Sequence, residues 1–216
     1  VSVYANDKNL VSEMKKKHQK GKINKKYELF DALCQEMEEK DYRMQDKTFS
    51  AKEAGTQGML LPIPFIVLVV IGYFWRWGAD ASPLWEINFL LFLILFIVSI
   101  PIHELIHGLT WANYAKKKMK SITFGFNVKE LMPYCHCKEA LEAKAYKIGV
   151  LAPVVVLGGG YFFLSLLFPN TELILLSAFN IFMAAGDLMI FWSARSIHEG
   201  LVIDHPELPG FVVFTK

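Results

Sequence analysis

The residues best suited to chemistry in this sequence form one short motif, His103-Glu104-Leu105-Ile106-His107. On a helix, the pattern H-E-x-x-H places both imidazoles on one face, one turn apart. That spacing suits two neighbouring ligands of a tetrahedral zinc ion, and the carboxylate between them can take a proton from zinc-bound water. The motif therefore predicts a hydrolytic metal site with His103 and His107 as ligands and Glu104 as the catalytic carboxylate.

A third metal ligand has to come from elsewhere in the chain, because a catalytic zinc usually has three protein ligands. Asp187 is the only Asp or Glu within the apolar run 173–192, and an unpaired carboxylate is costly inside a membrane span. His103 lies 14 residues after Phe89 and Asp187 lies 14 residues after Leu173, so each is about 21 Å along its expected helix. We therefore expect Asp187 to be the third ligand; the alternative is an Asp187 paired with a backbone amide or with Arg195.

Two other polar features are weaker candidates. Asn180 precedes Asp187 by seven residues, close to the same side of a helix. It could orient the site or donate to a developing oxyanion, and a plain interhelical hydrogen bond explains it equally well. The run Cys135-His136-Cys137 resembles a metal motif, but neighbours in an extended strand point to opposite faces. We interpret this run as ordinary loop residues, with a regulatory thiol pair as the alternative.

The composition places these residues in a membrane protein. Of the 216 residues, 53% are apolar or aromatic and 20% are charged, and the net charge is +2. The charges gather in residues 1–58, whereas the apolar residues come later in long runs. This distribution excludes an ordinary soluble globule, a disordered chain and a disulfide-rich secreted domain. The small net charge and the lack of a basic, aromatic-studded face exclude a nucleic-acid partner.

The apolar runs predict an all-α integral membrane protein with four transmembrane helices. We expect these helices at about residues 59–74, 87–111, 148–168 and 173–192. Between the second and third helices, segments 121–126 and 132–135 predict a short β-hairpin-like loop, and an amphipathic helix is expected at residues 27–42. The predicted parts of the chain are a polar N-terminal extension (1–58), a four-span metalloprotease domain (59–192) and a polar tail (193–216).

The charges of the connecting segments predict the orientation. Residues 113–147 carry eight Lys and three Glu. The positive-inside rule therefore puts this loop, the N-terminus and the C-terminal tail of a multi-pass cell-membrane protein in the cytosol. The three cysteines, Cys34, Cys135 and Cys137, would then face a reducing compartment and need no disulfide.

Several motifs together resemble a family of small bacterial membrane proteins, the zincin peptidases. The resemblance covers about residues 60–212 and rests on four motifs: His103-Glu104-x-x-His107-Gly108, Ala152-Pro153, Asn180…Gly186-Asp187 and the tail segment 204–211. The layout is more distantly similar to the site-2 class of intramembrane metalloproteases, but here Gly186 precedes the aspartate instead of following it. The resemblance implies a zinc metalloprotease with His103, His107 and Asp187 as ligands and Glu104 as the catalytic carboxylate.

The expected function is zinc-dependent hydrolysis of peptide bonds in membrane-anchored proteins or peptides, within the bilayer and near its cytosolic face. The alternative is a non-catalytic zinc-binding membrane protein, such as a transporter or a degenerate protease that serves as an assembly factor. A transporter needs ionisable groups on both sides of the metal. The outer halves of the second and fourth spans offer only Asn88, Ser177 and Glu172, which favours an enzyme. The sequence predicts no particular oligomeric state.

Overall fold

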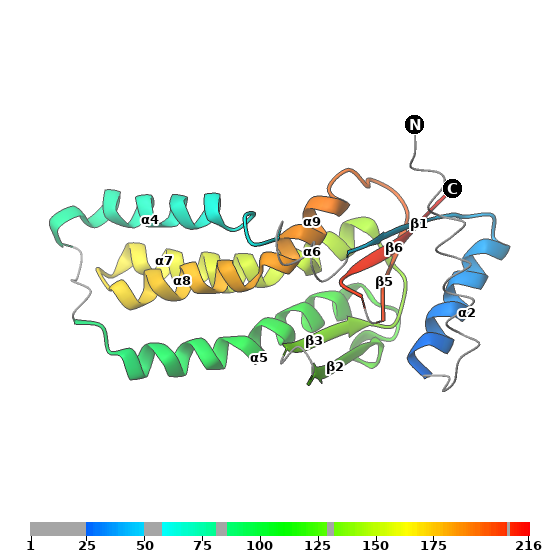
Figure 1. Cartoon of the computed structure of the whole chain (residues 1–216), viewed down its shortest axis with the longest axis horizontal. Helices are drawn as coiled ribbons and strands as arrows, with labels where there is room; N and C mark the ends of the chain where they lie inside the picture. Colours follow the sequence, from blue (N-terminus) through cyan, green and yellow to red (C-terminus); the bar gives the residue numbers. More distant parts are fainter. Residues whose placement is uncertain (1–24, 50–57, 81–85, 129–131, 207) are drawn as a thin grey trace.

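The chain forms a bundle of apolar helices at one end and a β-sheet with a covering helix at the other (Figure 1). The computed structural model describes residues 25–49, 58–80, 86–128, 132–206 and 208–216. The two longest helical stretches are α5 (Phe89–Tyr114) and the continuous run of α6 (Ala143–Pro153), the π-helical η4 (Val154–Gly159) and α7 (Gly160–Leu167). The other helices are α2 (Lys25–Glu39), α4 (Ile63–Trp77), α8 (Thr171–Met183) and α9 (Ala185–Ala194), with short 3₁₀ turns at η1 (Gly78–Asp80) and η3 (Lys118–Ser121).

The start of α5 and the packing of α8 follow from identifiable side chains. The side chain of Asn88 caps α5 by accepting a hydrogen bond from the Leu91 N–H at 3.0 Å, which satisfies a backbone donor that the helix leaves free. Gly158 lets α8 approach η4, because a Cβ at this position would lie 2.6 Å from Cγ1 of Ile181. The Ser177 hydroxyl donates to the carbonyl of Gly158 at 2.7 Å, so the glycine-rich run permits the close packing that small residues give membrane helices.

A four-stranded sheet joins three segments that are far apart in the sequence. Its order is β1-β6-β5-β4, and all neighbouring strands are antiparallel. The strands are β1 (Arg43–Thr48), β4 (Leu141–Glu142), β5 (Leu201–Asp204) and β6 (Gly210–Thr215). Pairing of β1 with β6 places Arg43 opposite Thr215 and Thr48 opposite Gly210. The N-terminal segment, the segment after α5 and the C-terminal segment therefore lie at the same end of the helices (Figure 1).

Both faces of this sheet are covered. On one face, Phe30 and Met37 of α2 pack in a cluster with the buried side chains of Ile203, Val212 and Phe214. The amphipathic helix expected at 27–42 is thus present as α2, and its apolar side lies on this chain's own sheet. The second face carries Val202, Phe211 and Val213, which pack in one core cluster with the ends of α5 and α6.

A separate two-stranded hairpin lies beside the H-E-x-x-H helix. It consists of β2 (Ile122–Asn127) and β3 (Met132–Cys137), paired antiparallel. The hairpin can lie against α5 because Gly108 has no side chain: a Cβ there would be 2.4 Å from Cζ of Phe124. The motif His-Glu-x-x-His is therefore followed by the one residue type that leaves room for this aromatic ring.

The predicted fold class, an all-α protein with four transmembrane helices, is wrong in two respects. The structure has a four-stranded sheet in addition to the expected hairpin. Its strands escaped notice because β4 and β5 are short, and because β1 and β6 lie in segments interpreted as a polar extension and a polar tail. Among the described residues, only two helices are long and apolar enough to cross a membrane, Phe89–Tyr114 and Ala143–Leu167, or three if α8 and α9 count as one bent span.

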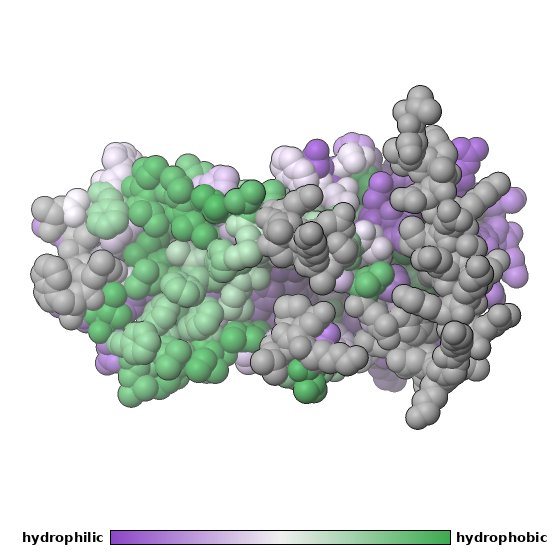
Figure 2. Space-filling model, viewed as in Figure 1, coloured by the Kyte–Doolittle hydropathy of each residue, from purple (hydrophilic) through white to green (hydrophobic). Residues whose placement is uncertain are grey.

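The other two apolar runs do not form single straight membrane-spanning helices, each for a different physical reason. The run at 59–74 yields α4, which has 15 residues and a length of about 22 Å, less than the ~30 Å of a hydrocarbon core. The run at 173–192 is bent by 53° between α8 and α9, which a hydropathy pattern does not reveal. Even so, on the face shown in Figure 2 hydrophobic residues gather over the helical end, and the coloured residues at the sheet end are mostly hydrophilic, as expected of a membrane protein.

A candidate metal centre on α5 and α9

Three side chains from two helices converge on one point of the bundle. Nε2 of His103 lies 2.9 Å from Oδ2 of Asp187, and Nε2 of His107 lies 3.3 Å from Oδ1 of the same carboxylate. The two Nε2 atoms are 3.2 Å apart. These three residues are the one group within the described parts of the chain whose metal-ligating atoms all lie within 4.8 Å of one another.

The break between α8 and α9 places the aspartate. Ala184 ends α8 with backbone angles of φ −80° and ψ 18°, outside the regular α-helical values, and α9 starts at the next residue. Asp187 consequently lies in the first turn of α9, where a negative charge is favoured by the helix dipole. Gly186 has open space around it, so it contributes no close helix contact there.

The donor set and its surroundings fit a zinc ion. Two imidazole nitrogens and one carboxylate are a known ligand set for catalytic zinc, with a fourth position left for water. Nδ1 of His107 donates to the carbonyl oxygen of Gly149 at 2.8 Å, which leaves the Nε2 lone pair directed at the other two groups. Both histidines are buried, with 6% exposure for His103 and 5% for His107. Without a cation, the 2.9 Å contact between His103 and Asp187 would be a hydrogen bond from the imidazole N–H to the carboxylate.

Glu104 and Asn180 lie beside this group in different ways. Glu104 is half-buried, and its carboxylate accepts a hydrogen bond from the backbone N–H of Cys135 in β3. Asn180 is buried in α8, where its amide nitrogen donates to the carbonyl oxygen of Leu176 at 2.8 Å. Its Oδ1 is buried without a hydrogen-bond partner in the described part of the chain, and the same holds for Nδ1 of His103. The structure therefore keeps Glu104 next to the ligands and gives Asn180 no described hydrogen bond to them.

The Cys135-His136-Cys137 run does not form a second metal-binding group among the described residues. The backbone N–H of Cys137 donates to Oδ2 of Asp204 at 3.2 Å, and Nδ1 of His136 lies 3.7 Å from the same oxygen. Burial raises the pKa of the Cys137 thiol to about 12 and also raises the pKa of Cys135. Since metals bind the thiolate, burial disfavours the metal-binding form of both thiols. The regulatory thiol pair stays a prediction.

Sequence reasoning missed the groups that hold the motif from outside. They are the Gly149 carbonyl on His107, the Cys135 amide on Glu104 and a stack of aromatic rings that runs away from the site. The ring of His107 stacks on Trp111 with a centroid distance of 5.1 Å, and Trp111 stacks on Tyr146 at 5.7 Å. Backbone groups leave no trace in a sequence. The one sequence feature that could have pointed to this contact is the glycine at position 149. In the structure, a Cβ there would be 2.0 Å from Nε1 of Trp111.

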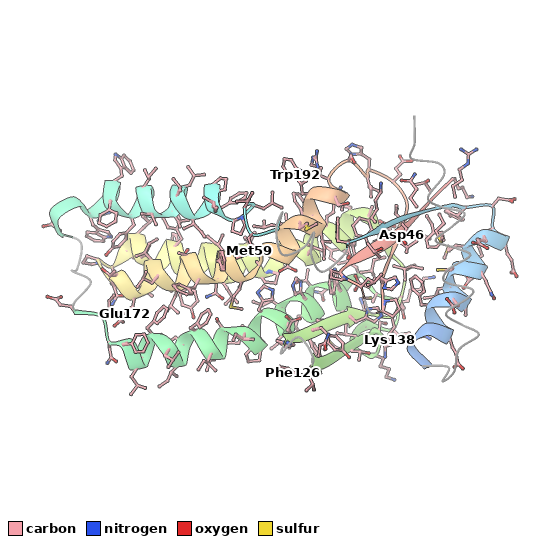
Figure 3. The ribbon with its side chains drawn as sticks, viewed as in Figure 1. Asp46, Met59, Phe126, Lys138, Glu172 and Trp192 are labelled. Atoms are coloured by element: carbon pink, nitrogen blue, oxygen red, sulfur yellow. The ribbon has the colours of Figure 1, made fainter. Side chains whose placement is uncertain are left out.

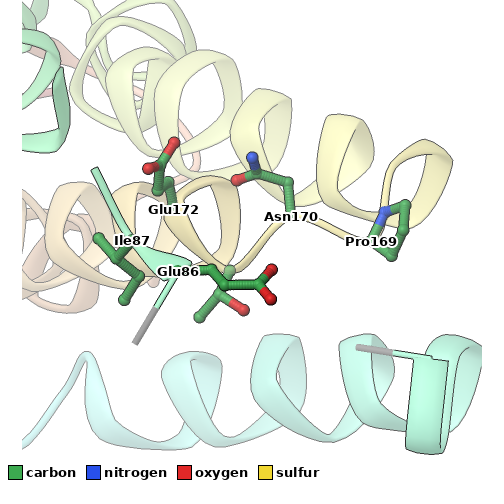
Figure 4. A pocket seen from close by; sticks show the side chains of 6 residues that line it. Glu86, Ile87, Pro169, Asn170 and Glu172 are labelled. Carbon is green, nitrogen blue, oxygen red and sulfur yellow. The ribbon is translucent and has the colours of Figure 1, made fainter. Parts of the chain in front are cut away.

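A hollow at the far end of the bundle is separate from this centre. Its lining comes from the segments before α5 and α8 and from the first two residues of α8 (Figure 4), namely Glu86, Ile87, Pro169, Asn170, Thr171 and Glu172. The carboxylate of Glu172 already accepts the Asn88 N–H there. In Figure 3, Glu172 lies at the helical end of the molecule, whereas Lys138 marks the sheet end. The hollow therefore takes no part in the candidate metal centre.

Two helices long and apolar enough to cross a membrane, together with the His–His–Asp group, define the class of this protein as one with a candidate metal centre between apolar helices. A family model described as "Putative zincin peptidase" matches residues 96–201, which confirms the resemblance seen in the sequence over this segment. The matched segment contains all of His103, Glu104, His107 and Asp187. No curated protein and no solved structure matches the chain.

Proposed function

We propose that this protein is a zinc-dependent peptidase that cleaves membrane-anchored proteins or peptides. The observation that carries the proposal is the convergence of His103, His107 and Asp187 within 4.8 Å, with Glu104 one residue from the first ligand. The family match to zincin peptidases supports the same chemistry. In this proposal His103 and His107 bind zinc through Nε2, and Asp187 binds it through a carboxylate oxygen.

The side chains around the site have distinct tasks in the proposed reaction. A bound zinc ion would lower the pKa of its water towards ~7 and polarise the scissile carbonyl. Glu104 takes the proton that the attacking water loses and returns it to the leaving amine. The Cys135 N–H holds one side of the Glu104 carboxylate, which keeps the proton acceptor at a defined place. The Gly149 carbonyl orients the His107 ring.

We also propose that the sheet end of the molecule faces the cytosol. The sheet brings the N-terminal segment, the segment after α5 and the C-terminal segment to one end of the helices. In the sequence, residues 113–147 carry eight Lys, and such an excess is typical of cytosolic segments. His107 precedes the end of α5 at Tyr114 by seven residues, or about 10 Å of helix, so cleavage would take place close to that membrane face.

The edge strand β3 of the hairpin limits how an extended substrate could bind beside the site. Scissile carbonyls are accessible only in an extended segment, and such a segment can add to a sheet edge. On β3, however, the N–H groups of Cys135 and Cys137 already donate to Glu104 and Asp204, and Pro133 has no N–H. A substrate that added to this edge would have to displace Glu104 from Cys135.

The test combines zinc content and hydrolysis on one detergent preparation of the full chain. Glu104→Gln should keep zinc and lose at least 100-fold in cleavage of single-span model peptides, the range expected for loss of a general base. Glu142→Gln, which changes an exposed carboxylate at the start of α6, is the control and should cleave like the parent. Cleavage by Glu104→Gln at the parental rate would refute the proposed mechanism. Zinc binding without any cleavage by the parent would favour the non-catalytic alternative.

A further inference from the structure

We propose that Asp204, in the C-terminal segment, is a positioning residue for the H-E-x-x-H helix and acts on it through β3 and α6. The inference rests on the proposed function. It adds a residue of β5 that lies outside the segment matched by the family model, which ends at residue 201.

The Asp204 carboxylate joins two elements that are not neighbours in the chain. Oδ1 accepts a hydrogen bond from the Tyr146 hydroxyl of α6 at 2.7 Å. Oδ2 accepts the backbone N–H of Cys137 in β3 at 3.2 Å, and Nδ1 of His136 lies 3.7 Å away. The side chain is only 11% exposed. A buried carboxylate with both oxygens engaged holds its partners in one arrangement, because releasing either leaves a costly unpaired group.

The two elements joined by Asp204 are the ones that contact the motif from outside. In β3, Cys135 lies two residues before Cys137, and its N–H donates to Glu104. In α6, Gly149 follows Tyr146 by one helical turn, and its carbonyl accepts from Nδ1 of His107. The two partners of Asp204, Cys137 and Tyr146, are therefore two and three residues away from Cys135 and Gly149. Those two residues supply the backbone groups that orient Glu104 and His107.

A third contact runs through the aromatic rings. Tyr146 stacks on Trp111, and its backbone carbonyl accepts the Trp111 indole N–H at 3.2 Å. Trp111 in turn stacks on the ring of His107. On its other side, Tyr146 lies against Phe211 of β6, with ring centroids 5.4 Å apart. Loss of the Asp204–Tyr146 hydrogen bond would therefore loosen the ring that supports both Trp111 and the adjacent imidazole.

The experiment measures zinc affinity of the full chain in detergent by competition with a chromophoric chelator, and also kcat and KM for a cleaved model peptide. Asp204→Ala should weaken zinc binding by 10- to 100-fold, the range for loss of groups that orient metal ligands. It should lower kcat with KM changed less than twofold. Tyr146→Phe, which removes one hydroxyl and keeps the ring, should change both quantities in the same direction by a smaller factor. If Asp204→Ala does not fold, Tyr146→Phe decides the question.

Glu139→Ala is the matched control. Glu139 is another half-buried carboxylate at the sheet end, and it accepts from the backbone N–H groups of Lys116 and Lys117 and from the Ser121 hydroxyl. None of these partners touches the motif, so this variant can lose stability but should keep parental zinc affinity. If Asp204→Ala and Tyr146→Phe also keep parental zinc affinity and kcat, Asp204 only stabilises the fold and the inference is overturned. A parent that binds no zinc would overturn the proposed function itself, and this inference with it.

Discussion

Replacing Gly149 by Ala tests whether α6 holds the motif through close contact with α5. A Cβ at this position would lie 2.0 Å from Nε1 and 2.2 Å from Cδ1 of Trp111, and ordinary contacts start at 3.4 Å. The indole ring would thus have to move by at least about 1.4 Å. It is 4% exposed and stacked between His107 and Tyr146, so it cannot move without disturbing both rings.

The size of the effect can be separated from helix propensity with a second glycine in the same continuous helix. A Cβ at Gly160 would meet nothing within 4 Å, so Gly160→Ala should gain up to ~1 kcal/mol from propensity alone. Gly149→Ala has the same gain but adds overpacking of about 1–3 kcal/mol. The difference between the two variants should therefore be about 1–3 kcal/mol in the free energy of unfolding.

The assay is unfolding in mixed micelles, followed by circular dichroism, together with zinc affinity of each folded variant. Because the Gly149 carbonyl accepts from His107, Gly149→Ala should also weaken zinc binding by about tenfold or more, whereas Gly160→Ala should not. Equal unfolding free energies and equal zinc affinities for the two variants would refute the packing argument.

Four further outcomes are expected. Asp187→Asn should lower zinc occupancy of the purified protein, since it removes a charged ligand atom; unchanged occupancy would remove Asp187 from the ligand set. Burial raises the pKa of Cys34 and of Cys137 to about 12. Iodoacetamide at pH 8 should therefore alkylate these thiols about 10³-fold more slowly in the folded than in the unfolded chain, which mass spectrometry can measure. The same shift means that folding stability falls as pH rises above 9, where unfolded thiols ionise first, and a stability that rose there would contradict it. Gly210→Ala should cost about 1–3 kcal/mol because its φ is +116° and a Cβ would lie 2.4 Å from the Lys47 carbonyl oxygen; protease digestion should then release the N-terminal segment faster than in the parent.

The candidate site was largely visible in the sequence because its signals are local. The spacing of His103 and His107 depends only on helix geometry. Asp187 stood out as a lone carboxylate in an apolar run, and the structure brings it to 2.9 Å from His103. The position of Asp187 at the start of a separate helix could not be predicted. The bend at Ala184 arises from a backbone conformation that no residue type in this run indicates. The role of Asn180 stays a prediction.

The sheet could not be predicted in the same way. The pairing of β1 with β6 joins Arg43 to Thr215 across almost the whole chain, and β4 has only two residues. Such pairing depends on which faces other elements cover, here α2 on one side and the ends of α5 and α6 on the other. Strand propensity is too dependent on that context to reveal it. The division of the chain at residues 58 and 192 stays a prediction, although strands from both outer parts share one sheet.

The most direct test of the account is to locate zinc by anomalous diffraction at its absorption edge in crystals of the zinc-loaded protein. The account predicts one strong peak about 2.0–2.2 Å from Nε2 of His103, Nε2 of His107 and a carboxylate oxygen of Asp187. A zinc-loaded crystal whose peak lies elsewhere, or whose ion lacks Asp187 as a ligand, would contradict it.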